Sequence, residues 1–259
     1  MRLEVFRRIN QGGTPLSGQD IRLAYYGEQS PSLGFIRLAG IHDPQRQSSQ
    51  RFIGTAKTLY GQDYPWIEPN ALRTWHDLWD GKDLTRGQTA SEMFLWSLVA
   101  AQFSQLDDIL QHESALSALG VRFNRSIDEA LDVYCAQTHY QDKNRDQPKA
   151  LMDLKEMRES FFPFFSAAVH KIGSMGPSLD VRKHRTVASV IGGAYRAKIP
   201  LENWTTNHWG QMVEFIRRPT ERSAALGIDW PQSKGRWDGI RGNRAQLEAA
   251  SKVVTAISR

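Results

Sequence analysis

The fold is decided by the stretch Met93–Leu110, which reads MFLWSLVAAQFSQLDDIL. Its composition and length predict a single helix. Large apolar side chains point almost all round the axis of that helix, and they are Phe94, Leu95, Trp96, Leu98, Val99, Phe103, Leu106, Ile109 and Leu110. A helix without a polar face is typical of the centre of a protein core. We therefore expect Met93–Leu110 to be the central helix of the molecule.

A second strong helix is predicted downstream, over Ala150–Ile172. Its apolar residues recur at steps of three and four, the period of an amphipathic helix, and they are Leu151, Leu154, Met157, Phe161, Phe165, Val169 and Ile172. Pro163 lies inside this pattern. Because proline lacks a backbone N–H and crowds the preceding turn, we expect a kink near Glu159.

Shorter helices are predicted around these two, and strand-like alternation is scarce. The expected helices cover residues 17–27, 52–60, 70–79, 126–134, 185–196, 204–217 and 246–257. The stretch Gly227–Gly242, rich in Gly, Trp and charge, is expected to be irregular. The predicted fold class is mainly α, an irregular helical bundle with few or no strands.

An internal boundary is expected at Gly173-Ser-Met-Gly-Pro177, where glycine and proline interrupt the helical pattern and basic charge begins. The predicted organisation is a motif segment of a turn and a helix over 1–27, a helical core over 28–173, and a basic helical C-terminal region over 174–259.

The composition is that of a folded protein without a membrane span. Hydrophobic residues make up 40% of the 259 and charged residues 24%, enough apolar surface to bury a core. No run of 18 apolar residues occurs, and MRLEVFRRIN lacks the apolar core of a secretory signal. The single cysteine, Cys135, excludes an internal disulfide and a zinc site with two thiolates. We expect a cytoplasmic protein with no membrane partner.

The net charge of +5 is unevenly distributed along the chain. Residues 181–259 contain 14 basic and six acidic residues, a net charge of +8, which leaves −3 for the first 180 residues. Such a basic region favours a polyanionic partner, nucleic acid before membrane. A solvated basic surface that maintains solubility is the alternative.

The eight tryptophans divide into two groups. One group lies among apolar residues and is predicted to be core: Trp66, Trp75, Trp79 and Trp96. The other is interleaved with arginine and lysine in the basic region: Trp204, Trp209, Trp230 and Trp237. Two interpretations of the second group stay open. These indoles either stack on unpaired bases or close a thin helical core.

The sequence contains no standard catalytic motif. It has no phosphate loop, no His-Glu-x-x-His and no Gly-x-Ser-x-Gly, and Gly173-Ser174-Met175-Gly176 is predicted to be an interhelical turn. The seven histidines lack ligand spacing. Asp153-Leu-Lys155 has the acid-x-Lys spacing of metal-dependent nucleases, but its helical context predicts a solvated charge pair. Catalytic residues stay unknown, and we predict neither a metal site nor a cofactor.

The N-terminal segment Val5–Arg22 reads VFRRINQGGTPLSGQDIR. It resembles the motif F-x-R-I-N-x-G-G-x-x-L-S-x-x-E-I-R of the GmrSD-type restriction endonuclease N-terminal domain family, with Asp20 in place of Glu. Tyr25-Tyr26-Gly27 fits the continuation of that motif. The family has a ParB/sulfiredoxin-like domain followed by helices. Its upstream Asp-Gly-Gln-Gln-Arg segment and an HNH-type nuclease arrangement have no counterpart here, so we expect the distal half of such a protein, from a truncated or split gene.

The resemblance implies a nucleic-acid-associated accessory or truncated component of a prokaryotic restriction or phage-defence system, with DNA the expected partner. A metal-dependent nuclease with a dispersed site, and a helical scaffold that completes a split partner protein, are the alternatives. Residues 1–27 are expected to form an exposed edge that binds a partner protein or a second copy. The Gly12-Gly13 turn either binds an anion through its backbone N–H groups or only fixes the turn between two structural elements. The predicted nucleic-acid or anion-binding residues are Arg7, Arg8, Asn10, Gly12, Gly13, Arg22, Arg182, Lys183, Arg185, Arg217, Arg218, Lys234, Arg236, Arg241 and Arg244.

Overall fold

The computed structural model describes residues 88–102, 104–105, 127–175, 184–231 and 239–259, together with Arg22, Tyr25, Tyr26, Ser30, Ser32, Leu33, Ala71, Thr74, Trp75 and Leu78. Helices are the regular secondary structure of this part of the chain, in which no strand occurs. The predicted mainly α class is confirmed. The helix expected at 52–60 and the tryptophans at 66, 79 and 237 lie outside the described residues.

Helix α6, Gln88–Ala101, is the centre of the bundle. It begins five residues before the predicted start at Met93, and the prediction of one continuous helix as far as Leu110 is wrong, because α6 ends at Ala101 and Gln102 is in a turn. Phe103 and residues 106–110 lie outside the described residues.

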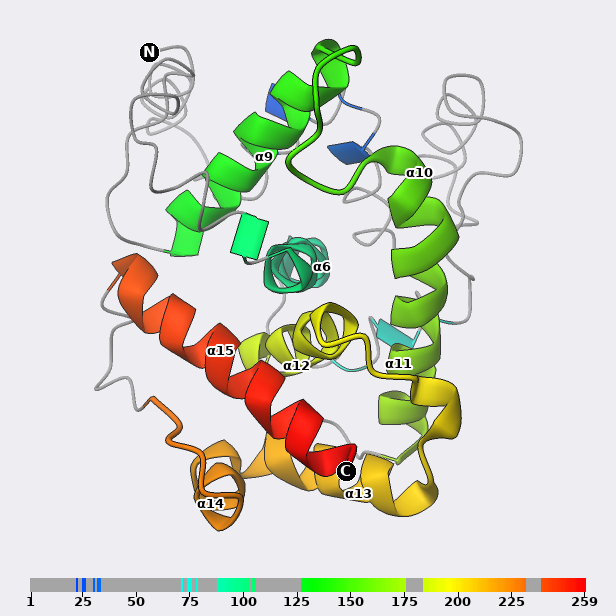
Figure 1. Ribbon diagram of the computed structural model, residues 1–259, viewed down its shortest axis with the longest axis vertical. Coiled ribbons are helices and arrows are strands. Elements are labelled where there is room, and N and C mark those ends of the chain that lie inside the picture. The colour runs from blue at the N-terminus through cyan, green and yellow to red at the C-terminus, as the bar shows by residue number, and fades with distance from the viewer. Residues whose placement is uncertain are drawn as a thin grey trace.

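Figure 1 views α6 nearly end-on, with α9, α11, α12 and α15 arranged around it. Its side chains from Met93 to Ala101 are buried on every side, as the sequence predicts, and Trp96 is fully inaccessible. The Trp96 indole donates a hydrogen bond to the Ser189 hydroxyl at 3.0 Å, which satisfies its polar N–H inside the core. Trp75 is also buried, so the core prediction is confirmed for both of these indoles.

Helix α12, His184–Arg196, lies between α6 and the C-terminal helix α15, Gly239–Ile257. Two adjacent glycines allow both neighbours to approach its backbone. A Cβ on Gly192 would lie 2.4 Å from the Ser97 carbonyl oxygen, and one on Gly193 would lie 3.2 Å from the Ser251 nitrogen. The missing side chains therefore set the spacing of three helices in the core.

Helix α9, Ile127–Lys143, extends well beyond the predicted end at Tyr134. The apolar pattern fades after Cys135, so the sequence shows little sign of the second half. In the second half of α9, buried polar side chains make the contacts with the rest of the protein. The Gln141 side chain bonds both the N–H and the C=O of Leu151, and Gln102 at the end of α6 accepts from the Met152 N–H. These amides fix the connection that leads into the next helix.

The predicted helix over Ala150–Ile172 begins at Leu154 and contains a π-helical turn. Helix α10, Leu154–Glu156, leads into η3, Met157–Phe161, which continues as α11, Phe162–Met175. The Phe162 N–H donates to the Met157 carbonyl, the wider spacing of a π turn. We expected a kink near Glu159, and the π turn is the local irregularity found at that residue. Pro163 follows it, at the second residue of α11.

The basic C-terminal region begins with α12 and then forms a short 3₁₀ turn η5, Leu201–Asn203, before α13, Thr206–Arg217. Thr205 caps α13 through a capping box with His208. Helix α14, Pro219–Ala225, follows at once and was not predicted, since the last helix expected before Gly227 ended at residue 217. Pro219 is its first residue, a position that suits proline. Helix α14 is followed by Leu226 and then by Gly227, whose φ of 69° suits glycine.

Two glycine-rich stretches are more helical than predicted. Helix α11 runs through Gly173 to Met175, because the glycine allows close packing on Thr74 rather than a turn. A Cβ at that position would lie 2.1 Å from the Thr74 methyl carbon. Likewise α15 begins at Gly239, inside the stretch expected to be irregular. The helices on both sides of the expected boundary at residues 173–177 contribute to one apolar core.

Candidate nucleic-acid interface

Arg22, the last residue of the N-terminal motif, lies inside the bundle. Its side chain is 1% exposed, and its guanidinium donates to Asp132 of α9 at 3.1 Å and lies 3.9 Å from Glu92 of α6. A buried arginine needs such carboxylates to offset its lost hydration. The prediction that Arg22 binds nucleic acid or an external anion is therefore wrong. This residue joins the motif segment to two core helices.

The residues that follow Arg22 also contact α9. Tyr26 is buried, and its ring lies 5.6 Å from the ring of His139. Further along, the Ser30 and Ser32 hydroxyls both donate to the Asp142 carboxylate, the second at 2.8 Å. The expected exposed edge over residues 1–27 is thus contradicted at Arg22 and Tyr26, which are covered by this chain's own helices. Residues 1–21, with Arg7, Arg8, Asn10, Gly12 and Gly13, lie outside the described residues.

The tryptophans of the basic region are core residues where the structure describes them. Trp204, Trp209 and Trp230 are 9%, 3% and 6% exposed. The rings of Trp204 and Trp209 pack edge to face with their centroids 4.8 Å apart. Trp230 packs edge to face on Phe215 with a centroid distance of 5.1 Å. Each of these indoles is therefore packed against another aromatic ring inside the protein and is not open to a base. Of the two interpretations, base stacking is wrong for these three indoles and closure of a thin helical core is confirmed.

Three arginines gather around one carboxylate at the junction of α13 and α14. Glu214 accepts from Arg217 at 3.1 Å through Oε1, and from Arg218 at 2.5 Å and Arg222 at 3.4 Å through Oε2. Arg218 also lies 3.4 Å from Glu221. We call Glu214 with Arg217, Arg218 and Arg222 the arginine cluster. Its arginines are 37%, 55% and 47% exposed, so the cluster is open to solvent.

The spacing of the arginine cluster follows from two consecutive helices. Arg217 and Arg218 are three and four residues beyond Glu214, which places them beside it at the C-terminal end of α13, with Arg218 as the C-cap. Pro219 then starts α14, whose second turn brings Arg222 back to the same carboxylate. Arg217 and Arg218 are among the binding residues predicted from the sequence, and Arg222 is not. Its i, i+4 spacing from Arg218 was the available signal, and the predicted helix end at residue 217 concealed it.

The electrostatics of the cluster favour the ionised forms of Glu214 and Arg218. The hydrogen bonds from Arg218, Arg217 and Arg222 lower the pKa of Glu214 to about 2. In return, Glu214 raises the pKa of Arg218 above its ordinary value. Three guanidinium charges oppose the two carboxylates at Glu214 and Glu221, so the cluster keeps a positive excess.

Of the other predicted basic residues of this region, Arg185 is the one whose side chain the structure describes. Arg185 is half-buried in the first turn of α12. Arg241 and Arg244 lie in the first turns of α15, but their side chains are outside the described part. Four further residues lie outside it entirely, and they are Arg182, Lys183, Lys234 and Arg236.

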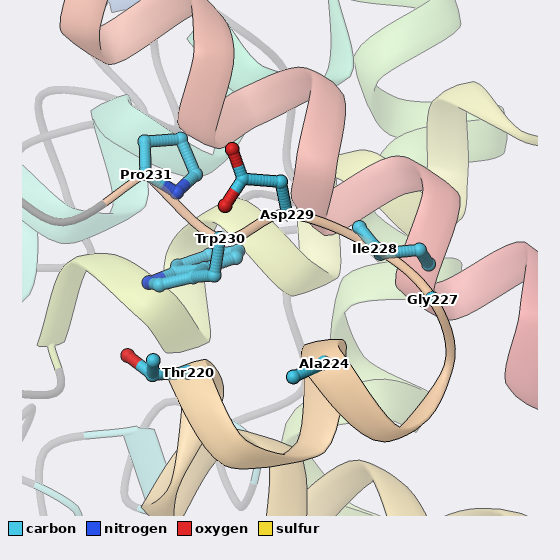
Figure 2. Close-up of a pocket in the computed structure, with 7 residues that line it drawn as sticks. All are labelled: Thr220, Ala224, Gly227, Ile228, Asp229, Trp230 and Pro231. Atoms are coloured by element: carbon cyan, nitrogen blue, oxygen red, sulfur yellow. The ribbon is translucent and has the colours of Figure 1, made fainter.

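A pocket of about 510 Å³ lies beside α14 (Figure 2). Thr220 and Ala224 line it from the helix, and the turn 227–231 closes the opposite side. Its polar side-chain groups are the Thr220 hydroxyl, the Asp229 carboxylate and the Trp230 indole N–H, and none of the described lining residues is basic. A phosphate is therefore disfavoured inside this pocket, although the arginine cluster begins on the same helix.

Nothing in the described residues forms a metal centre. They contain no group of three or more His, Cys, Asp or Glu side chains that could hold an ion. Asp153 of the acid-x-Lys triplet is the N-cap of α10 and pairs with Lys149 at 2.7 Å rather than with Lys155. The hydrogen bond from Lys149 is the main reason that the pKa of Asp153 is lowered. No helix in this part of the chain is long and apolar enough to cross a bilayer.

The arginine cluster is thus the place where predicted binding residues come together on the described surface. Arg22 is buried, and Arg185 lies on another helix. No family model, curated protein or solved structure matches this chain.

Proposed function

We propose that this protein binds nucleic acid, with DNA the expected form, through its basic C-terminal region. The observation that carries the proposal is the arginine cluster, in which Arg217, Arg218 and Arg222 are exposed side by side. Arginine is the side chain best suited to phosphate, because its planar guanidinium can donate two parallel hydrogen bonds. A net charge of +8 over residues 181–259 adds the long-range attraction that nucleic-acid binding uses.

The cluster retains donors for an external phosphate. A guanidinium has five N–H groups. Arg217 and Arg222 each direct one terminal nitrogen at Glu214, and Arg218 directs both of its terminal nitrogens at Glu214 and Glu221. The remaining N–H groups are supplied by side chains with a third to a half of their surface exposed. Contacts of this kind hold the backbone of a nucleic acid without reading its sequence.

The setting is part of the same proposal. We infer an accessory or truncated component of a prokaryotic restriction or phage-defence system, and the resemblance of Val5–Arg22 to the GmrSD-type family supports it. Binding is expected to be weakly selective for sequence. The buried tryptophans leave phosphate contacts, rather than base stacking, as the source of affinity in the described C-terminal region.

The test compares two double variants of equal charge. Arg217→Gln with Arg222→Gln removes two guanidiniums from the cluster and leaves the pair between Arg218 and Glu214. Lys155→Gln with Lys171→Gln removes the same charge from exposed positions on α10 and α11. Fluorescence anisotropy with a labelled duplex and a labelled single strand gives the affinity from 50 to 200 mM salt.

We expect the cluster variant to weaken binding and to reduce the slope of log K against log salt by about 1 for each phosphate that it no longer neutralises. The lysine variant should keep the wild-type slope. Equal slopes for wild type and the cluster variant would overturn the assignment of the cluster. Absence of salt-dependent binding by the wild type would overturn the proposed function itself.

A further inference from the structure

Glu214 is bound in the manner in which arginines bind an external oxyanion. Its two oxygens receive three guanidiniums that come from two helices, with Arg217 on Oε1 and both Arg218 and Arg222 on Oε2. A phosphate presents comparable oxygens to arginine clusters. The carboxylate therefore lies where a phosphate would make the largest number of contacts with this surface.

We propose that Glu214 is a built-in competitor that occupies the phosphate position of the arginine cluster and limits its affinity for phosphate groups. This role of Glu214 rests on the proposed function, and it explains what limits the affinity of the same site. A nucleic-acid phosphate enters either by displacing the carboxylate or by binding at the rim of the cluster beside it. In both cases Glu214 weakens binding, by direct competition in the first and by repulsion in the second.

The competitor is permanent under ordinary conditions. Because the arginines hold the pKa of Glu214 at about 2, its charge persists across the physiological pH range. It also lies on the same helix as Arg217 and four residues before Arg218, so it competes intramolecularly, as though present at high concentration. Salt and charge substitution, rather than pH, are therefore the means of changing its effect.

A purely structural role makes a different prediction. Glu214 connects the end of α13 to Arg222 of α14, and an ion pair across this junction could serve only to hold the two helices together. Its removal would then lower the melting temperature and leave phosphate affinity unchanged. Exposed ion pairs contribute little to stability, so we expect a small thermal effect and a clear effect on binding.

The deciding variant is Glu214→Gln, which keeps the shape and one acceptor oxygen and removes the charge. Glu202→Gln, at an exposed site on η5 outside the cluster, removes the same charge and is the matched control. Glu214→Asp keeps the charge and controls for the substitution itself. Affinity is measured with inorganic pyrophosphate by calorimetry and with a labelled DNA strand by anisotropy, and melting is followed by circular dichroism.

We expect Glu214→Gln to bind pyrophosphate and DNA about fivefold more tightly at low salt, the factor for removing one unit charge at about 4 Å in water. Glu202→Gln should stay within about twofold of wild type, because a distant exposed charge is screened. Glu214→Asp should also stay within about twofold, because it keeps the competing charge in the cluster. A gain for pyrophosphate without DNA binding by any variant would support the competitor and refute the proposed function. The inference is overturned if Glu214→Gln gains affinity for neither probe, or no more than Glu202→Gln.

Discussion

Replacing Gly192 by alanine is expected to destabilise the bundle, although alanine is normally the better helix former. The added Cβ would lie 2.4 Å from both the Ala100 Cβ and the Ser97 carbonyl oxygen of α6. It would also lie 2.7 Å from the Ala101 nitrogen. Two of these three atoms belong to the backbone of the central helix, so no side-chain rotation can relieve the overlap. Helices α6 and α12 would have to move apart.

The magnitude follows from two opposing contributions. Exchanging glycine for alanine inside a helix stabilises by about 1 kcal/mol. Forcing a methyl group into a packed core costs typically ~1–3 kcal/mol, and a clash with backbone belongs at the upper end. The free energy of unfolding should therefore fall by about 2 kcal/mol. For a chain of this size that corresponds to roughly 4–8 °C in melting temperature.

Two other glycines in helices provide graded controls for this measurement. A Cβ on Gly193 would meet the Ser251 backbone nitrogen at 3.2 Å, and one on Gly210 would meet nothing within 4 Å. In urea unfolding followed by circular dichroism, Gly210→Ala should gain about 1 kcal/mol from helix propensity, and Gly193→Ala should be close to neutral. Gly192→Ala alone should lose stability. If Gly192→Ala is as stable as Gly210→Ala, the close contact between α6 and α12 is refuted.

Three further outcomes are expected. Lys198 follows the end of α12 with a φ of 53°, a left-handed conformation that strains lysine and suits glycine. Lys198→Gly should therefore raise the free energy of unfolding in urea by roughly 1 kcal/mol. A loss of stability would contradict backbone strain at this residue. Burial raises the pKa of the Cys135 thiol from 9.0 to about 12, so the unfolded chain releases its proton first and stability should fall from pH 9 upward. Cys135→Ala should show a shallower decline than wild type in pH-dependent unfolding, and equal slopes would exclude the thiol as its cause. Asp132→Ala leaves Arg22 without its 3.1 Å partner and should cost ~3–5 kcal/mol, whereas a loss under about 1 kcal/mol would contradict the buried pair.

The central helix was predictable because its evidence is local. Every residue from Met93 to Ala101 is buried in the structure, as the nearly continuous apolar sequence indicates. Glycine was ambiguous, because the same residue serves turns and close packing. Gly173 was interpreted as part of a turn, but it lies inside α11 against Thr74, a contact that depends on a helix about a hundred residues away. Sequence pattern alone does not distinguish these two uses.

The candidate site was predictable as a region but not as a set of residues. The charge asymmetry pointed to the C-terminal third, and the described part of that third contains the arginine cluster. Arg22 was wrongly predicted to be a surface binding residue, because its partner Asp132 is 110 residues away in the chain. Nothing near Arg22 in sequence reveals that it is buried. Arg222 was missed for the opposite reason, since its partner Glu214 is near but on the far side of a proline that begins a new helix.

The position of α6 has a consequence for synthesis on the ribosome. Among the described helices its most extensive partner is α12, which begins at His184, 83 residues after α6 ends at Ala101. At translation rates of roughly 5–20 residues per second, α12 is completed on the order of 5–20 s after α6 has been made. During that time the apolar surface of α6 that α12 later covers stays exposed. Slowed elongation between these two helices would prolong the exposure and favour aggregation or chaperone capture of the nascent chain.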